Sequence, residues 1–375
     1  MSRERARPFF PATCHPVFSR RQFLVGGGTV LAAGGLGRRG ALGGQVSDDG
    51  TAIIRRYATV PEDPWLVAHG LRGIGRDFTV NGGRRAVDYL LEDVLVTLPA
   101  NEKGELGFPI AVEVHPNMFL KTMLEAGVPL DHAFTHEGRR RTLRDVVTGA
   151  RALFRPTLVT SVPNALPWSL IALVRTTTAL RQRWTNAWGE PVDLDLVVES
   201  ALRLLEQASV PVAEAMREGR PETAQAPVHG FTCGGTHMIY ALLAAVHAGY
   251  MGKDRRERVQ QQVDLLVWRL SADLDLMERF YRGRAGNAGA SWYELDAKLK
   301  LLGHGAECLA FATLHDVVGF TPSQRERRHV AVATLRRMLR DLESRNLEEA
   351  KTVDSELYRQ LIGDTCHARR GLTLA

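Results

Sequence analysis

The chain has 375 residues, of which 45% are hydrophobic and 24% are charged, the proportions of an ordinary globular protein. This composition excludes a disordered chain, a collagen-like fibre and a disulfide-dense small domain. The formal charge of +6 belongs to the N-terminal segment, since residues 1–43 contain seven Arg, no Lys and one Glu. The other 41 basic and 41 acidic residues balance, so the rest of the chain has no basic excess for nucleic-acid binding.

The N-terminal segment carries an export motif. Residues 19–24 read Ser-Arg-Arg-Gln-Phe-Leu and precede a weakly apolar run, rich in Gly and Ala, that is too short to span a membrane. This segment resembles a twin-arginine (Tat) signal peptide; the alternative is a basic tail with a chance Arg-Arg pair. The resemblance implies cleavage after residues 1–43, the twin-arginine translocase as export partner, and a periplasmic or extracellular protein. We expect no stable membrane span in the mature form.

Residues 44–375 are predicted to form a single all-α domain. Helical periodicity or helix-start residues mark the segments 63–75, 86–98, 116–126, 141–154, 161–178, 194–218, 238–249, 257–281, 292–318 and 324–348. Residues 103–114 are the one stretch that favours a strand. Repeated strand–helix alternation is absent, which makes a doubly wound sheet a poor match.

A short motif recurs along the chain. Residues 132–138 and 229–235 both read His-x-Phe-Thr-x-x-Gly, and looser echoes occur at 302–310 and at His69-Gly70. Recurring motifs in a helical chain suggest stacked hairpins that bring equivalent positions together. The pattern resembles an α/α toroid or an incomplete ring of helical hairpins, as in terpene cyclases, protein prenyltransferases, lanthionine cyclases and several carbohydrate-active enzymes. No diagnostic motif of any one of these families is present, so the resemblance implies an architecture and no function.

Three of these segments hold His or Cys pairs four residues apart, the spacing that puts two side chains on one face of a helix. Imidazole and thiolate are ligands that zinc and similar divalent metals prefer, so the sequence predicts a divalent metal site, with zinc as the best match. The candidate ligands are His132, His136, Cys233, His237, His304 and Cys308. They outnumber a normal zinc shell, so some of them must have another role.

Two carboxylates lie inside the same motifs. Glu137 and Glu307 are therefore candidate catalytic residues that would act on a metal-bound water. The leading hypothesis is an exported enzyme with a central His/Cys-lined cavity that acts on a small molecule. The alternatives left open are a metal-free carbohydrate-active hydrolase or lyase acting on a glycan, a non-catalytic helical-repeat module that binds an envelope partner, and His and Cys residues with a purely structural role.

Three cysteines remain after cleavage: Cys233, Cys308 and Cys366. An odd number cannot pair completely in an oxidising compartment, so at most one internal disulfide is expected, and Cys233–Cys308 is the candidate. Cys366 and His367 are assigned to a tail that would reach the site only by folding back. Trp184 and Trp188 are the best candidates for an exposed aromatic rim.

Overall fold

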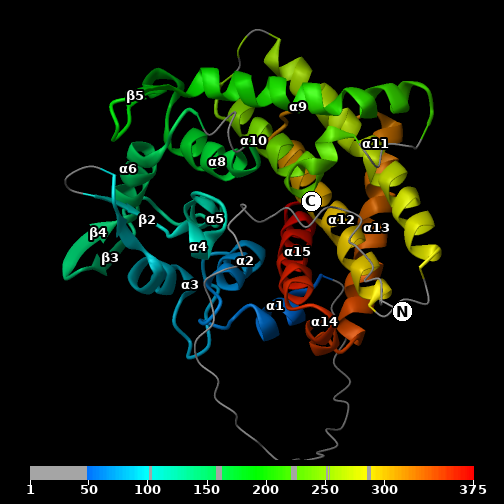
Figure 1. Cartoon of the computed structure of the whole chain (residues 1–375), viewed down its shortest axis with the longest axis horizontal. Coiled ribbons are helices and arrows are strands. Elements are labelled where there is room, and N and C mark those ends of the chain that lie inside the picture. The colour runs from blue at the N-terminus through cyan, green and yellow to red at the C-terminus, as the bar shows by residue number, and fades with distance from the viewer. Residues whose placement is uncertain are drawn as a thin grey trace, which may run out of the picture.

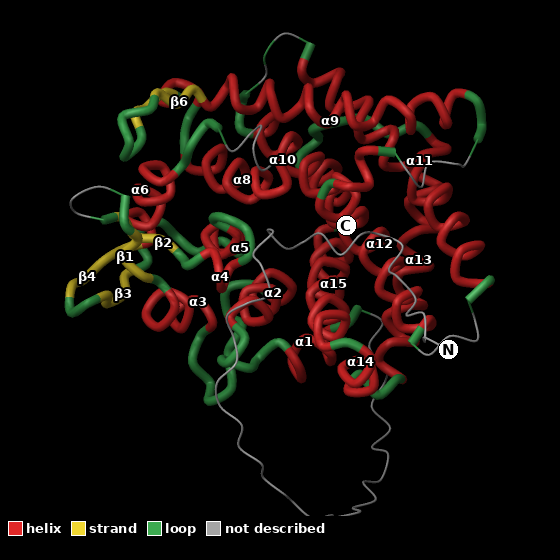
Figure 2. The backbone as a smooth tube through the Cα atoms, viewed as in Figure 1, coloured by secondary structure: helices red, strands yellow, loops and turns green. Residues whose placement is uncertain are grey.

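The computed structural model describes residues 49–100, 104–157, 163–220, 226–250, 252, 254–284 and 289–375. The predicted signal peptide, residues 1–43, lies outside the described residues. Helices dominate the described part of the chain, which confirms the all-α prediction, and the strands are short (Figures 1 and 2). None of the described helices combines the length and the apolar character needed to cross a bilayer.

Most of the α-helices are joined by short connections. Their bounds are α1 (Thr51–Tyr57), α2 (Pro64–Ile74), α3 (Ala86–Tyr89), α4 (Ile110–Glu113), α5 (Met118–Glu125), α6 (Leu143–Leu153), α8 (Leu166–Thr176), α9 (Leu194–Arg217), α10 (Thr236–His247), α11 (Arg255–Arg282), α12 (Ala290–Leu314), α13 (Pro322–Ser344), α14 (Glu348–Val353) and α15 (Ser355–Leu374). Short helical turns are η1 (Leu90–Val94), η2 (Pro163–Ala165), η3 (Ala179–Arg181), η4 (Pro227–Gly230) and η5 (Thr232–Gly235). Each segment predicted to be helical contains a helix.

Side-chain caps fix where several helices begin. At α2, Asp63 Oδ1 accepts a hydrogen bond from the Leu66 backbone N–H at 3.2 Å, and Pro64 occupies the first position, where its missing N–H costs nothing. At α13, Thr321 and Gln324 cap each other's backbone N–H groups at 3.2 and 2.8 Å. Each cap stabilises its helix by about 1 kcal/mol, so these starts follow from local sequence.

Six of the described helices form the interior. Helix α2 contacts α5, which contacts α8, and the contacts continue through α10, α12 and α15 back to α2, so they close into a circuit. Figure 1 shows α9, α11 and α13 outside this set along the top and right, and α3 and α6 on the left. The inner helices are deeply buried, and every residue of α10 from Thr236 to Val246 is shielded from solvent. The circuit therefore brings together side chains from distant parts of the chain.

The most extensive contact in the circuit joins α12 and α15, and glycines make it close. A Cβ atom on Gly371 would lie 2.6 Å from the backbone nitrogen of Glu307, and one on Gly303 would lie 3.1 Å from the carbonyl oxygen of Asp364. The assignment of Cys366 and His367 to a tail was wrong, because both lie within inner helix α15.

Three antiparallel hairpins complete the described structure. They are β1 (Val96–Leu98) with β2 (Glu105–Gly107), β3 (Ala133–His136) with β4 (Arg139–Thr142), and β5 (Arg183–Thr185) with β6 (Pro191–Asp193). The helix predicted over 86–98 gives way to β1 after η1. The strand expected within 103–114 is confirmed by β2, which α4 follows. Figure 1 shows the β3–β4 hairpin at the left edge of the molecule, away from the inner helices.

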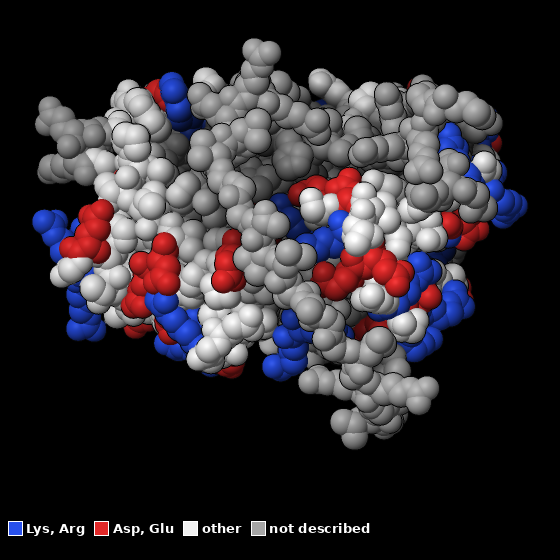
Figure 3. All heavy atoms as spheres, turned by 60° about the horizontal axis from the view of Figure 1, so that its bottom comes forward, with Lys and Arg blue, Asp and Glu red and all other residues white. Residues whose placement is uncertain are grey.

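Ion pairs link outer helices and leave the surface charge mixed. Arg258 on α11 pairs with Glu199 and Glu206 on α9 at 2.9 and 2.6 Å. On the face seen in Figure 3, small groups of acidic and basic side chains alternate among the described residues. The Arg258 pairs are partly buried and hold α9 against α11.

Candidate functional site

A small pocket of about 60 Å³ lies among the inner helices. Four segments that are distant in sequence supply its reactive side chains, and one of them is η5 together with α10, which follows it directly. These side chains are His69 (α2), Cys233 (η5), His237 (α10), His304 (α12), and Asp364 and His367 (α15). Polar side chains are costly in an apolar interior, so their concentration at one place indicates a site.

The loop that presents Cys233 has an unusual backbone. Cys233, Gly234 and Gly235 have φ values of 51°, 63° and 80°, all in the left-handed region, and helix α10 begins directly after them. Arg269 holds this loop by donating a hydrogen bond from Nη1 to the carbonyl oxygen of Gly234 at 2.6 Å, while its Nε donates to Asp273 at 2.8 Å. A left-handed cysteine costs on the order of 1–3 kcal/mol, which the anchored arginine helps to offset.

Two side chains converge on one nitrogen atom of His304. The Sγ of Cys233 lies 3.5 Å, and the Oδ1 of Asp364 lies 2.9 Å, from Nε2 of His304. The ligand atoms of Cys233, His237 and His304 all lie within 4.8 Å of one another. In a tetrahedral zinc site with ordinary bond lengths, a sulfur and a nitrogen ligand are about 3.6 Å apart. Cys233, which is half-buried, and the buried His237 and His304 therefore have the dimensions of a site that could hold a divalent metal ion.

A thiol–imidazole–carboxylate triad fits the same atoms less well. In such a triad the nucleophile and the carboxylate contact opposite nitrogens of the imidazole, so that the ring is held on one side while it accepts a proton on the other. Here Cys233 and Asp364 both approach Nε2 of His304. One ring nitrogen cannot bond well to both, whereas a metal ion is shared by several donors.

Four imidazoles of the pocket, those of His69, His237, His304 and His367, are neutral near pH 7. Burial lowers the pKa of His69 and of His304 to about 3, and it lowers the pKa of His237 and of His367 well below the usual value. The positive charge of Arg72 acts on each pKa in the same direction. A neutral imidazole keeps a lone pair for a metal ion, so the electrostatics suit ligation.

Asp364 is a buried carboxyl group beside His304, and Asp296, also buried, lies near it across Lys300. Burial raises the pKa of Asp296 and of Asp364 to about 7, and Lys300 opposes the shift. Lys300 Nζ lies 3.2 Å from Asp296 Oδ2 and 3.9 Å from Asp364 Oδ2. A cation bound at His304 would favour the ionised form of Asp364, so this carboxyl group suits a ligand that becomes charged when a metal binds.

Glu307 lies on the same helix as His304 and is engaged with its own partners. Its Oε1 pairs with Arg72 at 2.5 Å and with Arg370 at 3.0 Å, and its Oε2 lies 2.6 Å from Nδ1 of His367. A carboxylate held by two guanidinium groups cannot turn freely toward a water molecule. The contacts of Glu307 therefore favour orienting His367 over acting on water directly.

Aromatic rings line two sides of the pocket. The Trp65 and His69 rings lie 3.7 Å apart between centroids, and Trp168 stacks on His115 at 3.7 Å with an interplanar angle of 7°. Val114, next to His115, has a φ of 67°, which is a strained conformation for a β-branched residue. Strained backbone thus borders the pocket at Val114 as well as at Cys233.

The structure brings three of the six predicted ligands together: Cys233, His237 and His304. His132 and His136 lie at the β3–β4 hairpin, outside the pocket, and His132 Nε2 is 3.0 Å from Asp88 Oδ1. The assumption that these two histidines share a helix was wrong, because the motif forms a hairpin there.

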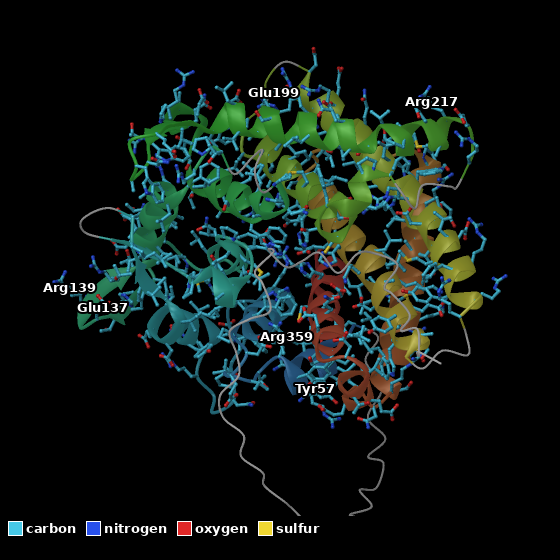
Figure 4. The ribbon with its side chains drawn as sticks, in the orientation of Figure 1. Tyr57, Glu137, Arg139, Glu199, Arg217 and Arg359 are labelled. Carbon is cyan, nitrogen blue, oxygen red and sulfur yellow. The ribbon has the colours of Figure 1, made fainter. Side chains whose placement is uncertain are left out.

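Glu137, Cys308 and the predicted aromatic rim also lie outside the pocket. Glu137 occupies the hairpin turn with a φ of 49° and a side chain 70% exposed, and Figure 4 shows it far from Arg359, which lines the pocket mouth. Cys308 is buried within α12, where burial raises the pKa of its thiol well above the usual value. Trp184 donates to the carbonyl oxygen of Arg151 near β5.

None of the cysteines in the described part of the chain belongs to a disulfide, so the Cys233–Cys308 bridge is not formed. Sequence reasoning also missed several pocket residues. They are His115, Asp364 and His367. The sequence signals were the His-Gly echo at His69 and the Cys-His pair at 366–367. Neither could be assigned to the site from the sequence, because their place depends on how the helices pack.

Comparisons with known proteins identify no relative. The chain matches no protein-family model, no curated protein and no solved structure. The geometry of the pocket is therefore the basis on which a function can be assigned.

Proposed function

We propose that this protein is an exported enzyme that depends on a divalent metal ion, with zinc as the best match. Cys233, His237 and His304 would hold the ion as three protein ligands, and Asp364, which lies against His304, would be an exchangeable fourth ligand that water or substrate can replace. The observation that carries the proposal is the approach of a thiol and a carboxyl oxygen to one imidazole nitrogen, from three separate elements, in an open pocket. Thiolate, imidazole and carboxylate are all ligands that zinc accepts.

Zinc with an exchangeable ligand position lowers the pKa of a bound water and polarises a substrate carbonyl group. The residues around the ligands fit a site for such chemistry on a small molecule. Arg269 anchors the Cys233 loop and so fixes the thiol. Trp65 and Trp168 line the pocket, and each ring packs against a histidine of the pocket. A metal-assisted hydrolysis or addition reaction is the class that this arrangement favours.

The proposal extends to fold and location. The closed circuit of contacts from α2 through α15 supports an α/α toroid, with the pocket among its inner helices. The Ser-Arg-Arg-Gln-Phe-Leu motif at residues 19–24 supports export by the twin-arginine route, which carries folded proteins. Export after folding would allow the metal to be inserted in the cytoplasm.

Metal analysis tests the proposal. The mature protein, exported through its own signal, is analysed by ICP-MS beside a Cys233→Ser/His237→Ala variant. The matched control is His132→Ala/His136→Ala, which removes the other four-spaced pair outside the pocket. We expect zinc in the wild type and in the control, and its loss from the folded pocket variant. No metal in the wild type, even after zinc addition, would refute the proposal.

A second candidate is a metal-free enzyme that acts on a glycan. Two observations favour it: tryptophans border the pocket, and the pKa values of Asp296 and Asp364 of about 7 suit proton transfer near neutral pH. Glycan cleavage that survives complete metal removal, and that Asp364→Asn abolishes, would support this candidate over the metalloenzyme.

A further inference from the structure

His69 and His367 form a second pair of imidazoles in the pocket. Both rings line it, and both are buried. They come from α2 and α15, which pack against each other in the inner circuit. Neither belongs to the group of Cys233, His237 and His304, although His367 lies in a second group of possible ligands with His304 and Glu307. The proposed first metal site therefore does not use His69 or His367.

The tautomer of His69 follows from its hydrogen bond. Its Nδ1 lies 2.8 Å from the carbonyl oxygen of Trp65. A carbonyl oxygen can only accept, so Nδ1 carries the proton and Nε2 keeps its lone pair. The ring fits closely against α15 because residue 363 is glycine: a Cβ atom there would lie 3.2 Å from Cδ2 of His69 and 2.6 Å from the Trp65 ring.

The same reasoning fixes the tautomer of His367. Its Nδ1 lies 2.6 Å from Oε2 of Glu307, a carboxylate paired with Arg72 and Arg370. The carboxylate accepts the Nδ1 proton, so the Arg72 Nε–H at 3.2 Å cannot also donate to that nitrogen. Nε2 of His367 therefore keeps its lone pair.

This pattern is that of metal ligands. A histidine that binds a metal through one nitrogen almost always donates its other N–H to a carbonyl or carboxylate, as both of these do. The two ring centroids lie 5.5 Å apart with an interplanar angle of 68°. Two imidazoles bound to one zinc ion at ordinary bond lengths have centroids about 5 Å apart. The spacing therefore suits one ion between them.

The pair lies directly beside the first site. The His367 ring centroid is 3.8 Å from that of His304 and 5.3 Å from that of His237. Metal ions in two-metal enzymes lie about 3.5–4 Å apart and act together on one substrate. The rings of the two ligand sets are in direct contact, so two ions held by these sets would adjoin each other.

We propose that the pocket binds a second divalent metal ion through Nε2 of His69 and Nε2 of His367, which makes the centre dinuclear. This inference rests on the proposed metal-dependent function. The second ion has two protein ligands and neutral donors, so it binds more weakly than the first. Water or substrate completes its coordination.

Cobalt titration of the metal-free mature protein tests this inference. Co²⁺ bound to a thiolate gives a near-ultraviolet charge-transfer band, which reports the Cys233 site alone. We expect this band to saturate at one equivalent while total binding, measured by equilibrium dialysis, reaches two. Two adjacent Co²⁺ ions couple magnetically, so the EPR intensity per cobalt falls as the second equivalent binds.

The variant His69→Ala removes one ligand of the second ion only. We expect it to bind one equivalent and keep the thiolate band, while the matched control His132→Ala binds two. His69→Gln repeats the test if circular dichroism shows that the alanine variant does not fold. The second site alone would be refuted if the wild type bound one equivalent of cobalt with the thiolate band. It would also be refuted if a folded His69 variant bound two equivalents. No bound cobalt at all would instead refute the proposed function.

Discussion

Two residues of the pocket have positive φ angles, a backbone conformation that is rare for residues other than glycine. Cys233 and Val114 both line it, and both have positive φ values, 51° and 67°. Such conformations cost on the order of 1–3 kcal/mol each and persist only where neighbouring groups hold them. Arg269 does so for the Cys233 loop. The spacing of Cys233 to His237 marked it as a candidate ligand. The loop was not predictable, because φ angles and a partner 36 residues away are not visible in a motif.

Gly234→Ala tests the importance of this loop. A Cβ atom at Gly234 would lie 2.6 Å from Nη2 of Arg269, and the residue has a φ of 63°. The matched control is Gly189→Ala, which has a φ of 77° but open space around the new atom. We expect the control to lose about 1–2 kcal/mol of unfolding free energy in urea from the left-handed conformation alone. The Gly234 variant should lose more and also bind less zinc; equal losses and unchanged zinc would show that Arg269 does not constrain the loop.

Glu113 gives a pH-dependent prediction. It is buried and accepts hydrogen bonds from the backbone N–H groups of Asn117 and Phe119, and burial raises its pKa to about 8. The folded state then binds a proton that the unfolded state releases above pH 4.5, so this group's contribution to stability is full below pH 4.5 and is lost as pH rises toward 8. The slope is at most about 1.4 kcal/mol per pH unit.

The variant Glu113→Gln cannot lose that proton. We expect its unfolding free energy, relative to the wild type, to rise between pH 5 and pH 8 and then level off. Urea titrations at a series of pH values measure this difference. A difference that stays constant with pH would mean that Glu113 titrates normally.

Some helices were predictable from the sequence and others were not. Capped helices such as α2 and α13 were predicted within a few residues, because their start signals are local. Helix α15 was missed because its buried face carries Asp364, Thr365 and His367 instead of a continuous apolar stripe. The polar residues of the site thus interrupt the apolar pattern by which this helix would have been predicted. At residues 132–138 the prediction was wrong for a different reason. The residues resemble those at 229–235 but form a β-hairpin instead of a helix.

The packing of α12 against α15 predicts the effect of Gly371→Ala. The new Cβ atom would lie 2.6 Å from the backbone nitrogen of Glu307 and would push the helices apart. We expect a loss of about 1–3 kcal/mol together with weaker zinc binding, because His304 and Asp364 lie on the two helices. Gly319→Ala, where a Cβ atom meets nothing within 4 Å, is the control. Wild-type stability and zinc content in the Gly371 variant would contradict this view of the interface.

At the scale of the whole molecule, the site joins residues from 69 to 367. Helical class and most helix positions follow from periodicity, which is local. The meeting of α2 with α15 does not, because it depends on contacts between opposite ends of the domain. This is why Cys233, His237 and His304 were found from their motifs, whereas His69 was noted only as an echo and His367 was assigned to a tail.

The proposed export signal can be tested at its paired arginines. Replacing the paired arginines by Arg20→Lys/Arg21→Lys keeps the charge but removes the pair that a twin-arginine signal resembles. We expect the variant to stay in the cytoplasm as uncleaved precursor, detected by fractionation and immunoblotting. The control Arg38→Lys/Arg39→Lys should still be exported. Normal export of the Arg20/Arg21 variant would contradict the twin-arginine route and indicate that the protein leaves the cytoplasm by another one.

Zinc K-edge X-ray absorption of the exported protein tests the central claim most directly. If Cys233, His237, His304 and Asp364 hold zinc, the spectrum contains a sulfur ligand at about 2.3 Å and nitrogen or oxygen ligands at about 2.0–2.2 Å. The sulfur contribution disappears in Cys233→Ser and persists in Cys308→Ser. A first shell without sulfur in the wild type, or sulfur that remains in Cys233→Ser, would contradict the account.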